Sequence, residues 1–273
     1  MDIKDHWDHN ARMPLLFIGH GCPMNAIQTN KFTLSLQALG NKIPQPKAIV
    51  CISAHWLTTG TWVTHMLSPR TIHDFYCFPK KLFKVVYPAP GSPETAELIK
   101  TLVTETSINL DDEQWGLDHG TWSVMRHIYP RANIPIVQLS IDIEKPEEFH
   151  YQMGQQLYLL RERDILIVSS GNLVHNLSKV SWECKSKPYD WAIEFDEWIK
   201  EKLIRRDFVA LINHYGNTLA GKLSVPTCDH YYPLLYILGA ARSEDELVFI
   251  YEGIENSSVS MRTFFLGMNL NKQ

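Results

Sequence analysis

The strongest constraint on the fold is a pair of short, almost entirely apolar runs that each lead to a histidine. Residues 48–54 read Ala-Ile-Val-Cys-Ile-Ser-Ala and end at His55, and residues 15–18 read Leu-Leu-Phe-Ile and are followed, after one glycine, by His20. Runs of this length without a polar face are typical of strands that are buried on both sides in a parallel sheet. Because ligands bind at the carboxyl ends of such strands, both histidines stand where chemistry is expected.

Strands and helices alternate along the rest of the chain. The apolar patterns predict further strands over 61–66, 134–141, 165–170, 247–251 and 259–266, and helices over 32–39, 92–106, 146–163 and 189–208, with shorter ones ending near 127 and 241. Residues 1–12 show little periodicity and are expected to be an extension of low order. No repeat or composition shift marks a boundary. We therefore predict an α/β fold, a single domain over 1–273 with a largely parallel central sheet flanked by helices.

Composition narrows the class of partner. The 273 residues carry a formal net charge of -4 without a long basic run, which argues against nucleic acid or an anionic membrane as the principal partner. No apolar run approaches the roughly 20 residues of a spanning helix, and the polar N-terminus is unlike a secretory signal. The five scattered cysteines are typical of reduced thiols. We expect a cytoplasmic protein that acts on a small molecule; its oligomeric state is left open.

Four histidines stand in comparable places: His20, His55, His175 and His230. Neutral imidazole is a common ligand of Zn²⁺ and Fe²⁺, and strand ends offer the rigid frame that a metal site needs. One such histidine alone would more often be an ordinary buried or surface side chain. Several at equivalent strand exits favour a metal site, so we predict one at the carboxyl ends of the strands.

Other candidates are weaker. His119, beside Asp118 in a predicted loop that also holds two tryptophans, is about equally well explained as a packing residue or as a substrate contact. Cys22 and Cys228 each lie two residues from a candidate ligand, but small buried thiols need no such role, and we expect them not to bind metal. The segment 68–91 is rich in proline and aromatic residues and is expected to be an ordered loop over a pocket.

The sequence resembles a known family in five places. These motifs span residues 16–21, 53–56, 116–122, 170–176 and 229–234. They are similar, in the same order, to the 4,5-DOPA extradiol dioxygenase family, which belongs with the class III extradiol ring-opening enzymes of the protocatechuate 4,5-dioxygenase type. The resemblance implies an α/β fold and one divalent metal per chain at His20, His55 and His230, with His175 either a further ligand or the nearby acid/base. It implies Zn²⁺ in the bacterial branch, with Fe²⁺ as the alternative.

One position departs from the wider class, which uses two histidines and one carboxylate. Here His230 takes the third position and no acidic residue stands out as its substitute, so the site is closer to a three-histidine zinc site. The resemblance implies a dioxygenase that cleaves a catechol such as L-DOPA with O₂ to a muconate semialdehyde. In this reaction His175 would remove a catechol proton, and His119 would hydrogen-bond a substrate oxygen or the dioxygen. A hydrolase using zinc-activated water and a metal-binding protein without turnover are the alternatives.

Overall fold

Four parallel strands form the centre of an eight-stranded sheet in the computed structural model, which describes residues 12–183 and 186–267. In spatial order these are β5 (Ile136–Asp142), β2 (Ala48–Thr58), β6 (Ile165–Gly171) and β1 (Leu15–Gly19). One side is extended by β3 (Thr61–Thr64) and β4 (Ile108–Asp111), the other by β10 (Thr263–Gly267) and β7 (Glu246–Tyr251). Strand β3 runs antiparallel to β5, and β10 runs antiparallel to both β1 and β7.

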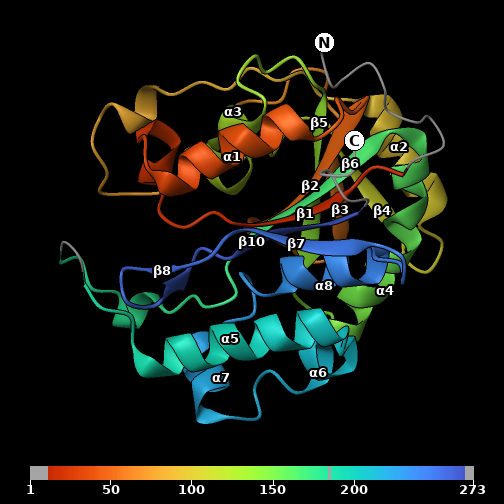
Figure 1. Ribbon diagram of the computed structural model, residues 1–273. Coiled ribbons are helices and arrows are strands. Elements are labelled where there is room, and N and C mark those ends of the chain that lie inside the picture. Colours follow the sequence, from red (N-terminus) through yellow and green to blue (C-terminus); the bar gives the residue numbers. More distant parts are fainter. Residues whose placement is uncertain (1–11, 184–185, 268–273) are drawn as a thin grey trace.

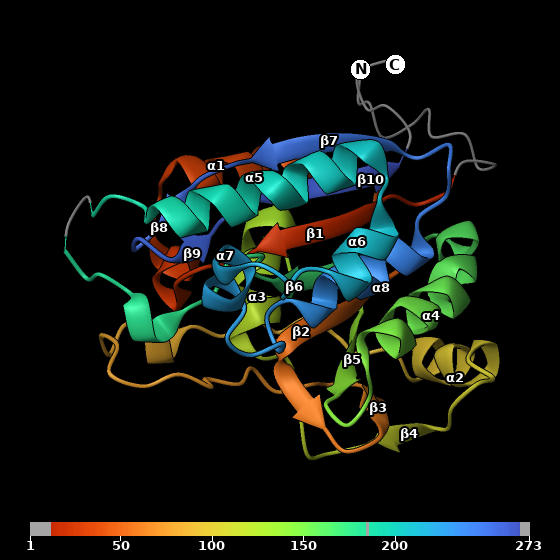
Figure 2. The same ribbon diagram turned by 90° about the horizontal axis from the view of Figure 1, so that it is seen from below.

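Helices cover both faces of the sheet (Figure 1, Figure 2). One face packs against α1 (Lys31–Lys42) and α3 (His119–Ile128), the other against α2 (Pro93–Leu102), α4 (Glu147–Leu157) and α8 (Tyr232–Ala240), with α5 (Asp190–Arg205), α6 (Phe208–Asn213) and α7 (Leu219–Ser224) beyond them. Every residue of β1, β5 and β6 is buried, as expected for strands between two helical layers. The predicted α/β fold with a largely parallel sheet is confirmed; a single domain over 1–273 stays a prediction.

Several predicted boundaries differ in the structure. The expected helix over 146–163 continues beyond α4 only as a 3₁₀ helix, Tyr158–Arg163. The helix expected to reach 208 ends at Arg205, because the left-handed backbone of Arg206 stops α5 before α6 begins. Strand β4 was not predicted, and the expected strand over 259–266 divides into β9 (Val259–Ser260) and β10. The N-terminal extension lies outside the described residues apart from residue 12.

The smaller elements surround one edge of the sheet. They are β8 (Ile254–Glu255), which pairs with β9, and 3₁₀ helices at Pro23–Ile27, Leu82–Lys84 and Leu177–Lys179. No helix in the described part of the chain is both long and apolar enough to cross a membrane.

Strand β2 is bulged where it approaches the site. Its pairing with β6 stops at Ser53, and its register with β5 shifts between Ile52 and Leu57. His55 lies inside this irregular stretch, so the prediction that the strand ends at His55 was wrong. A bulge re-aims a side chain without ending the strand, and this one directs His55 toward the edge where β1 leads into His20.

Candidate metal centre and active site

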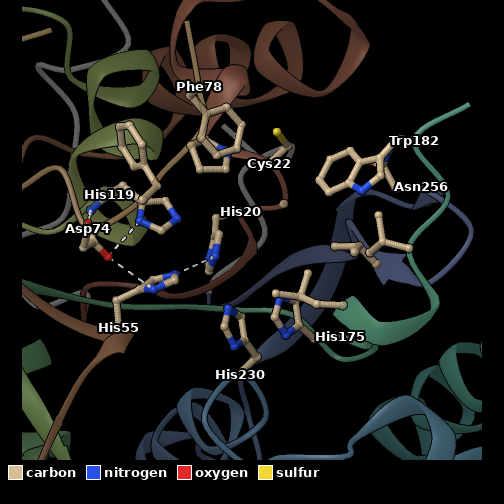
Figure 3. Close-up of a pocket in the computed structure, with 16 residues that line it drawn as sticks. His20, Cys22, His55, Asp74, Phe78, His119, His175, Trp182, His230 and Asn256 are labelled. Carbon is tan, nitrogen blue, oxygen red and sulfur yellow. Dashed lines mark hydrogen bonds and ion pairs between the residues drawn. The ribbon is translucent and has the colours of Figure 1, made fainter. Parts of the chain in front are cut away.

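Three imidazole rings converge at the carboxyl edge of the central strands (Figure 3). His20 directly follows β1, His55 comes from the bulge of β2, and His230 comes from the turn before α8. One ring nitrogen from each lies within 4.8 Å of the others, and the Nε2 atoms of His20 and His55 are 3.2 Å apart. The predicted set is thus brought together, although His230 arrives from a turn before a helix rather than from a strand end.

Each of these rings is oriented through its Nδ1 atom. The Nδ1 of His20 is 3.0 Å from the hydroxyl of Ser170, which itself donates to a backbone carbonyl and therefore accepts from the ring. The Nδ1 of His55 is 3.3 Å from a carboxylate oxygen of Asp74. The Nδ1 of His230 contacts Asp229. With a proton on each Nδ1, all three Nε2 lone pairs are left for a ligand, as in carboxylate–histidine–metal arrangements.

The trio fits a divalent metal ion. Burial, together with the neighbouring imidazoles, holds the pKa values of His20 and His55 well below their usual range, so both rings are neutral, as ligation requires. Two nitrogens about 2.1 Å from a shared ion, at an angle of about 90–110°, lie roughly 3.0–3.4 Å apart. The 3.2 Å separation of the two Nε2 atoms falls within this range.

A glycine at the end of β6 allows His230 to approach the sheet. The backbone N–H of Asn172 donates to the carbonyl of His230 at 3.0 Å. A Cβ atom on Gly171 would overlap this carbonyl, so any larger residue would push the turn and its histidine outward.

Asp74 is a site residue that the sequence did not reveal. It lies in the irregular loop before the 3₁₀ helix Leu82–Lys84, where no periodicity indicates which side chains point inward. One carboxylate oxygen accepts from the Nδ1 of His119 at 2.9 Å, and the other accepts from the His119 backbone N–H at 2.9 Å. Burial raises the pKa of Asp74, but the hydrogen bonds from His119 outweigh it and lower the pKa, so the carboxylate stays ionised. Asp74 contacts two of the histidines and does not take the place of His230, so the prediction that no acidic residue substitutes for His230 stays a prediction.

His119 is the first residue of α3, not a loop residue as predicted. Asp118 is the N-cap, and its carboxylate accepts from the backbone N–H of Thr121 at 3.2 Å. The same buried carboxylate accepts from Ser53 at 2.7 Å and from Gln138 at 2.6 Å, which ties α3 to β2 and β5. Burial raises the pKa of Asp118. These bonds fix the start of the helix and with it the His119 ring.

His175 lies beside the trio. Its ring stacks on that of His230, with centroids 3.4 Å apart and planes 11° from parallel. Imidazole lone pairs lie in the ring plane, so two stacked parallel rings point past each other rather than at one shared ion. This geometry favours a role next to the metal over a role as its fourth ligand.

The rings form the inner wall of a cavity of about 340 Å³. The loop predicted to cover a pocket contributes Asp74, Phe75 and Phe78, and apolar side chains that follow His175 close the other side. Cys22 also lines the cavity, whereas the thiol of Cys228 lies 3.2 Å from a tyrosine hydroxyl. Among the described residues no cysteine belongs to a group with metal-ligand spacing.

The chain was compared with models of known protein families. Residues 14–264 match the family model described as the catalytic LigB subunit of aromatic ring-opening dioxygenase. The chain belongs to this family and is an extradiol aromatic ring-opening dioxygenase.

Individual proteins of known sequence or structure are also similar to this chain. The chain is 46% identical to the 4,5-DOPA dioxygenase extradiol of Escherichia coli (strain K12) over 271 residues, covering 97% of this chain and 98% of that protein. It is 35% identical to the 4,5-DOPA dioxygenase extradiol of Beta vulgaris over 254 residues, covering 91% and 94%. The crystal structure of an uncharacterized protein from Escherichia coli K12 superposes with a TM-score of 0.82 at 45% identity, covering 94% of this chain and 100% of that one.

Proposed function

We propose that this dioxygenase opens the ring of a catechol such as L-DOPA beside its two hydroxyl groups, using O₂ and giving a muconate semialdehyde. The observation that carries the proposal is a cavity with aromatic side chains on its walls and three convergent imidazoles at its inner end. A flat aromatic ring fits such walls, and hydroxyl oxygens suit a metal held by imidazoles. The names of the relatives point to the same substrate class.

We further propose that one divalent metal per chain is held by the Nε2 atoms of His20, His55 and His230. Three imidazoles are a good donor set for Zn²⁺, the ion predicted first, and they also suit Fe²⁺. When bound, Fe²⁺ would supply the redox chemistry with O₂ that Zn²⁺, which has no redox change, does not. We therefore expect either ion to occupy the same ligands and ring opening to depend on Fe²⁺.

His175 is assigned the proton transfer. Burial lowers the pKa of its imidazole to about 2, with the neighbouring His230 acting in the same direction, so the ring is neutral and one of its nitrogens carries no proton. Its stacking on His230 supports a position next to the proposed metal rather than a role as a ligand. A catechol hydroxyl bound there would have His175 as its proton acceptor.

His119 is assigned the positioning of a substrate oxygen. Its Nδ1 is bonded to Asp74, so its Nε2 is the atom that remains to face the cavity. A fixed imidazole at this point holds the substrate for reaction and needs no reorganisation during it.

The test is O₂ uptake with L-DOPA by metal-free protein reconstituted separately with Fe²⁺ and with Zn²⁺. The proposal predicts one O₂ consumed per catechol with Fe²⁺ and almost none with Zn²⁺. Metal binding without O₂ uptake under either condition would contradict it. If the zinc form then hydrolysed ester or amide substrates, the zinc hydrolase would be correct; otherwise the non-catalytic metal-binding protein would be. The cytoplasmic location stays a prediction.

A further inference from the structure

A second cavity continues outward from the one that holds the histidines. The two share four lining residues, namely Cys22, Phe78, Trp182 and Asn256. Three of these surround the entrance to the site in Figure 3, where Cys22, Trp182 and Asn256 lie on the side away from His55. The outer cavity therefore adjoins the inner one at these shared residues, and a substituent on a ring bound at the histidines can extend toward it.

The charges along this path are unbalanced. In the part of the chain that the structure describes, no lysine or arginine lines either cavity. The inner cavity holds Asp74, whose oxygens are already bonded to His119. The outer cavity holds Glu255. A metal dication would make the inner end positive, so the path is positive where the catechol oxygens bind and negative at its outer end.

Glu255 is a carboxylate without a cationic partner. Among the described residues no lysine or arginine lies within 4.0 Å of its oxygens. Burial raises its pKa, and a hydrogen bond from the amide of Asn25 only partly offsets this. A partly desolvated carboxylate in this position gains from pairing with a cation supplied by a ligand.

The backbone fixes Glu255 relative to the reacting end of the cavity. Glu255 of β8 pairs with Val259 of β9, and Val259 both lines the inner cavity and forms an isolated bridge with His175. The turn between β8 and β9 is held to the loop after His175 by two hydrogen bonds of 3.0 Å between Asn256 and Ser181. The carboxylate is thus carried by a braced hairpin, which suits selective binding.

We propose that the outer cavity is a subsite for a cationic substituent of the catechol, and that Glu255 pairs with an ammonium group carried on a short alkyl arm. This inference rests on the proposed function, which places the catechol ring in the inner cavity. It predicts discrimination by charge: an ammonium group is favoured, whereas a carboxylate on the same arm finds no cation along the described walls. For L-DOPA it is the ammonium group, not the carboxylate, that the chain recognises.

The test compares three catechols with arms of equal length: dopamine, its neutral isostere 4-propylcatechol, and anionic 3-(3,4-dihydroxyphenyl)propanoate. We measure kcat/KM for the Fe²⁺ enzyme and, without O₂, the Kd of each catechol for the Zn²⁺ form by calorimetry at about pH 8, where both the amine and a carboxylate are charged. Wild-type protein should prefer dopamine over 4-propylcatechol about tenfold, as expected for a charge-assisted hydrogen bond, and should bind the propanoate more weakly than either.

The variant E255Q keeps the shape of the side chain and removes its charge, so the ratio of dopamine to 4-propylcatechol should fall to near one in both measurements. The control E113Q removes an exposed carboxylate outside both cavities and should keep the wild-type ratio. An unchanged ratio in E255Q overturns the proposal, as does a wild-type preference for the propanoate. If no catechol is cleaved, the proposed function fails, but the ratio of Kd values still tests the subsite.

Discussion

Two clusters, each of two histidines and one aspartate, face each other across the site, and they are built differently. The Asp74 cluster consists of His55, Asp74 and His119, and the Asp229 cluster consists of His175, Asp229 and His230. Each contains one member of the convergent trio and one further histidine. In the Asp74 cluster the carboxylate is bonded to both imidazoles. In the Asp229 cluster it contacts the ring of His230, and the second histidine is held by stacking on that ring.

This difference suits His119 and His175 to different roles. His119 is held by hydrogen bonds at its ring and at its backbone, which fixes both its orientation and the nitrogen that carries the proton. The backbone of His175 is anchored by a 2.8 Å hydrogen bond from its N–H to Ser224, but no described residue hydrogen-bonds its ring. A fixed ring suits holding a substrate, and a ring with free nitrogens suits moving a proton.

The largest effect is expected from His175→Ala. Loss of a positioned proton acceptor should lower kcat by about 10²–10⁴-fold, while the metal stays bound because the trio is intact. Steady-state O₂ uptake and metal content are measured on the same sample. If activity and metal content fall together in proportion, His175 is a ligand and the separation of roles is wrong.

Some parts of the site could be predicted from the sequence and others could not. The strands that deliver His20 and His55 are near-continuous apolar runs, so their type and burial follow from the hydrophobic pattern alone. The bulge in β2 could not be predicted from this pattern, because it depends on pairing with β5 and leaves no local signal in the sequence. Asp74 lies in an irregular loop, where inward and outward positions have no period.

The contacts within the Asp229 cluster could not be predicted from the sequence either. Asp229 and His230 are adjacent in the sequence, yet only the turn before α8 brings the carboxylate against the Nδ1 of that ring. Stacking of His175 on His230 depends on Gly171, which lets the turn approach the end of β6. Contacts between residues far apart in sequence follow from tertiary packing, so the histidines were predictable from the sequence, whereas the two aspartates and the stacking of His175 were not.

A smaller effect is expected from replacing the aspartate of each cluster, and it tests directly whether the two clusters have different roles. In Asp74→Asn and Asp229→Asn a neutral amide replaces the carboxylate, and loss of such a partner commonly costs about 10–100-fold in activity or metal affinity. Asp74→Asn should mainly lower kcat, since it releases His119. Asp229→Asn should mainly raise the Kd for metal, with activity recovering at saturating metal. Metal titrations with kcat at each concentration check this; the same profile in both variants would remove the distinction.

The smallest effect is expected for His150, a buried histidine outside both clusters, which tests whether burial alone keeps a histidine of this protein neutral. His150 of α4 lies 3.0 Å from the hydroxyl of Tyr236, and burial lowers its pKa to about 4. The unfolded chain, with a histidine pKa of about 6.5, therefore binds the proton more tightly, and stability falls as pH drops from about 6.5 toward about 4. By about pH 5 this costs about 2 kcal/mol.

Denaturant unfolding of wild-type protein and His150→Gln at about pH 7.5 and about pH 5 isolates this contribution. Wild type should lose about 2 kcal/mol more than the variant over this range, with activity at about pH 7.5 similar in both proteins. Equal losses in the two proteins would mean that burial alone does not suppress protonation of a histidine here. The neutral state of His20 and His55 would then need another cause.

Metal content measured on four purified alanine variants tests the central claim most directly. We predict that His20→Ala, His55→Ala and His230→Ala each fall far below one metal ion per chain, because each removes one of three convergent nitrogens. His175→Ala, prepared and measured in parallel, should keep about one ion per chain. Full occupancy in any of the first three variants, or loss of metal in the fourth equal to theirs, would contradict a three-histidine centre with His175 beside it.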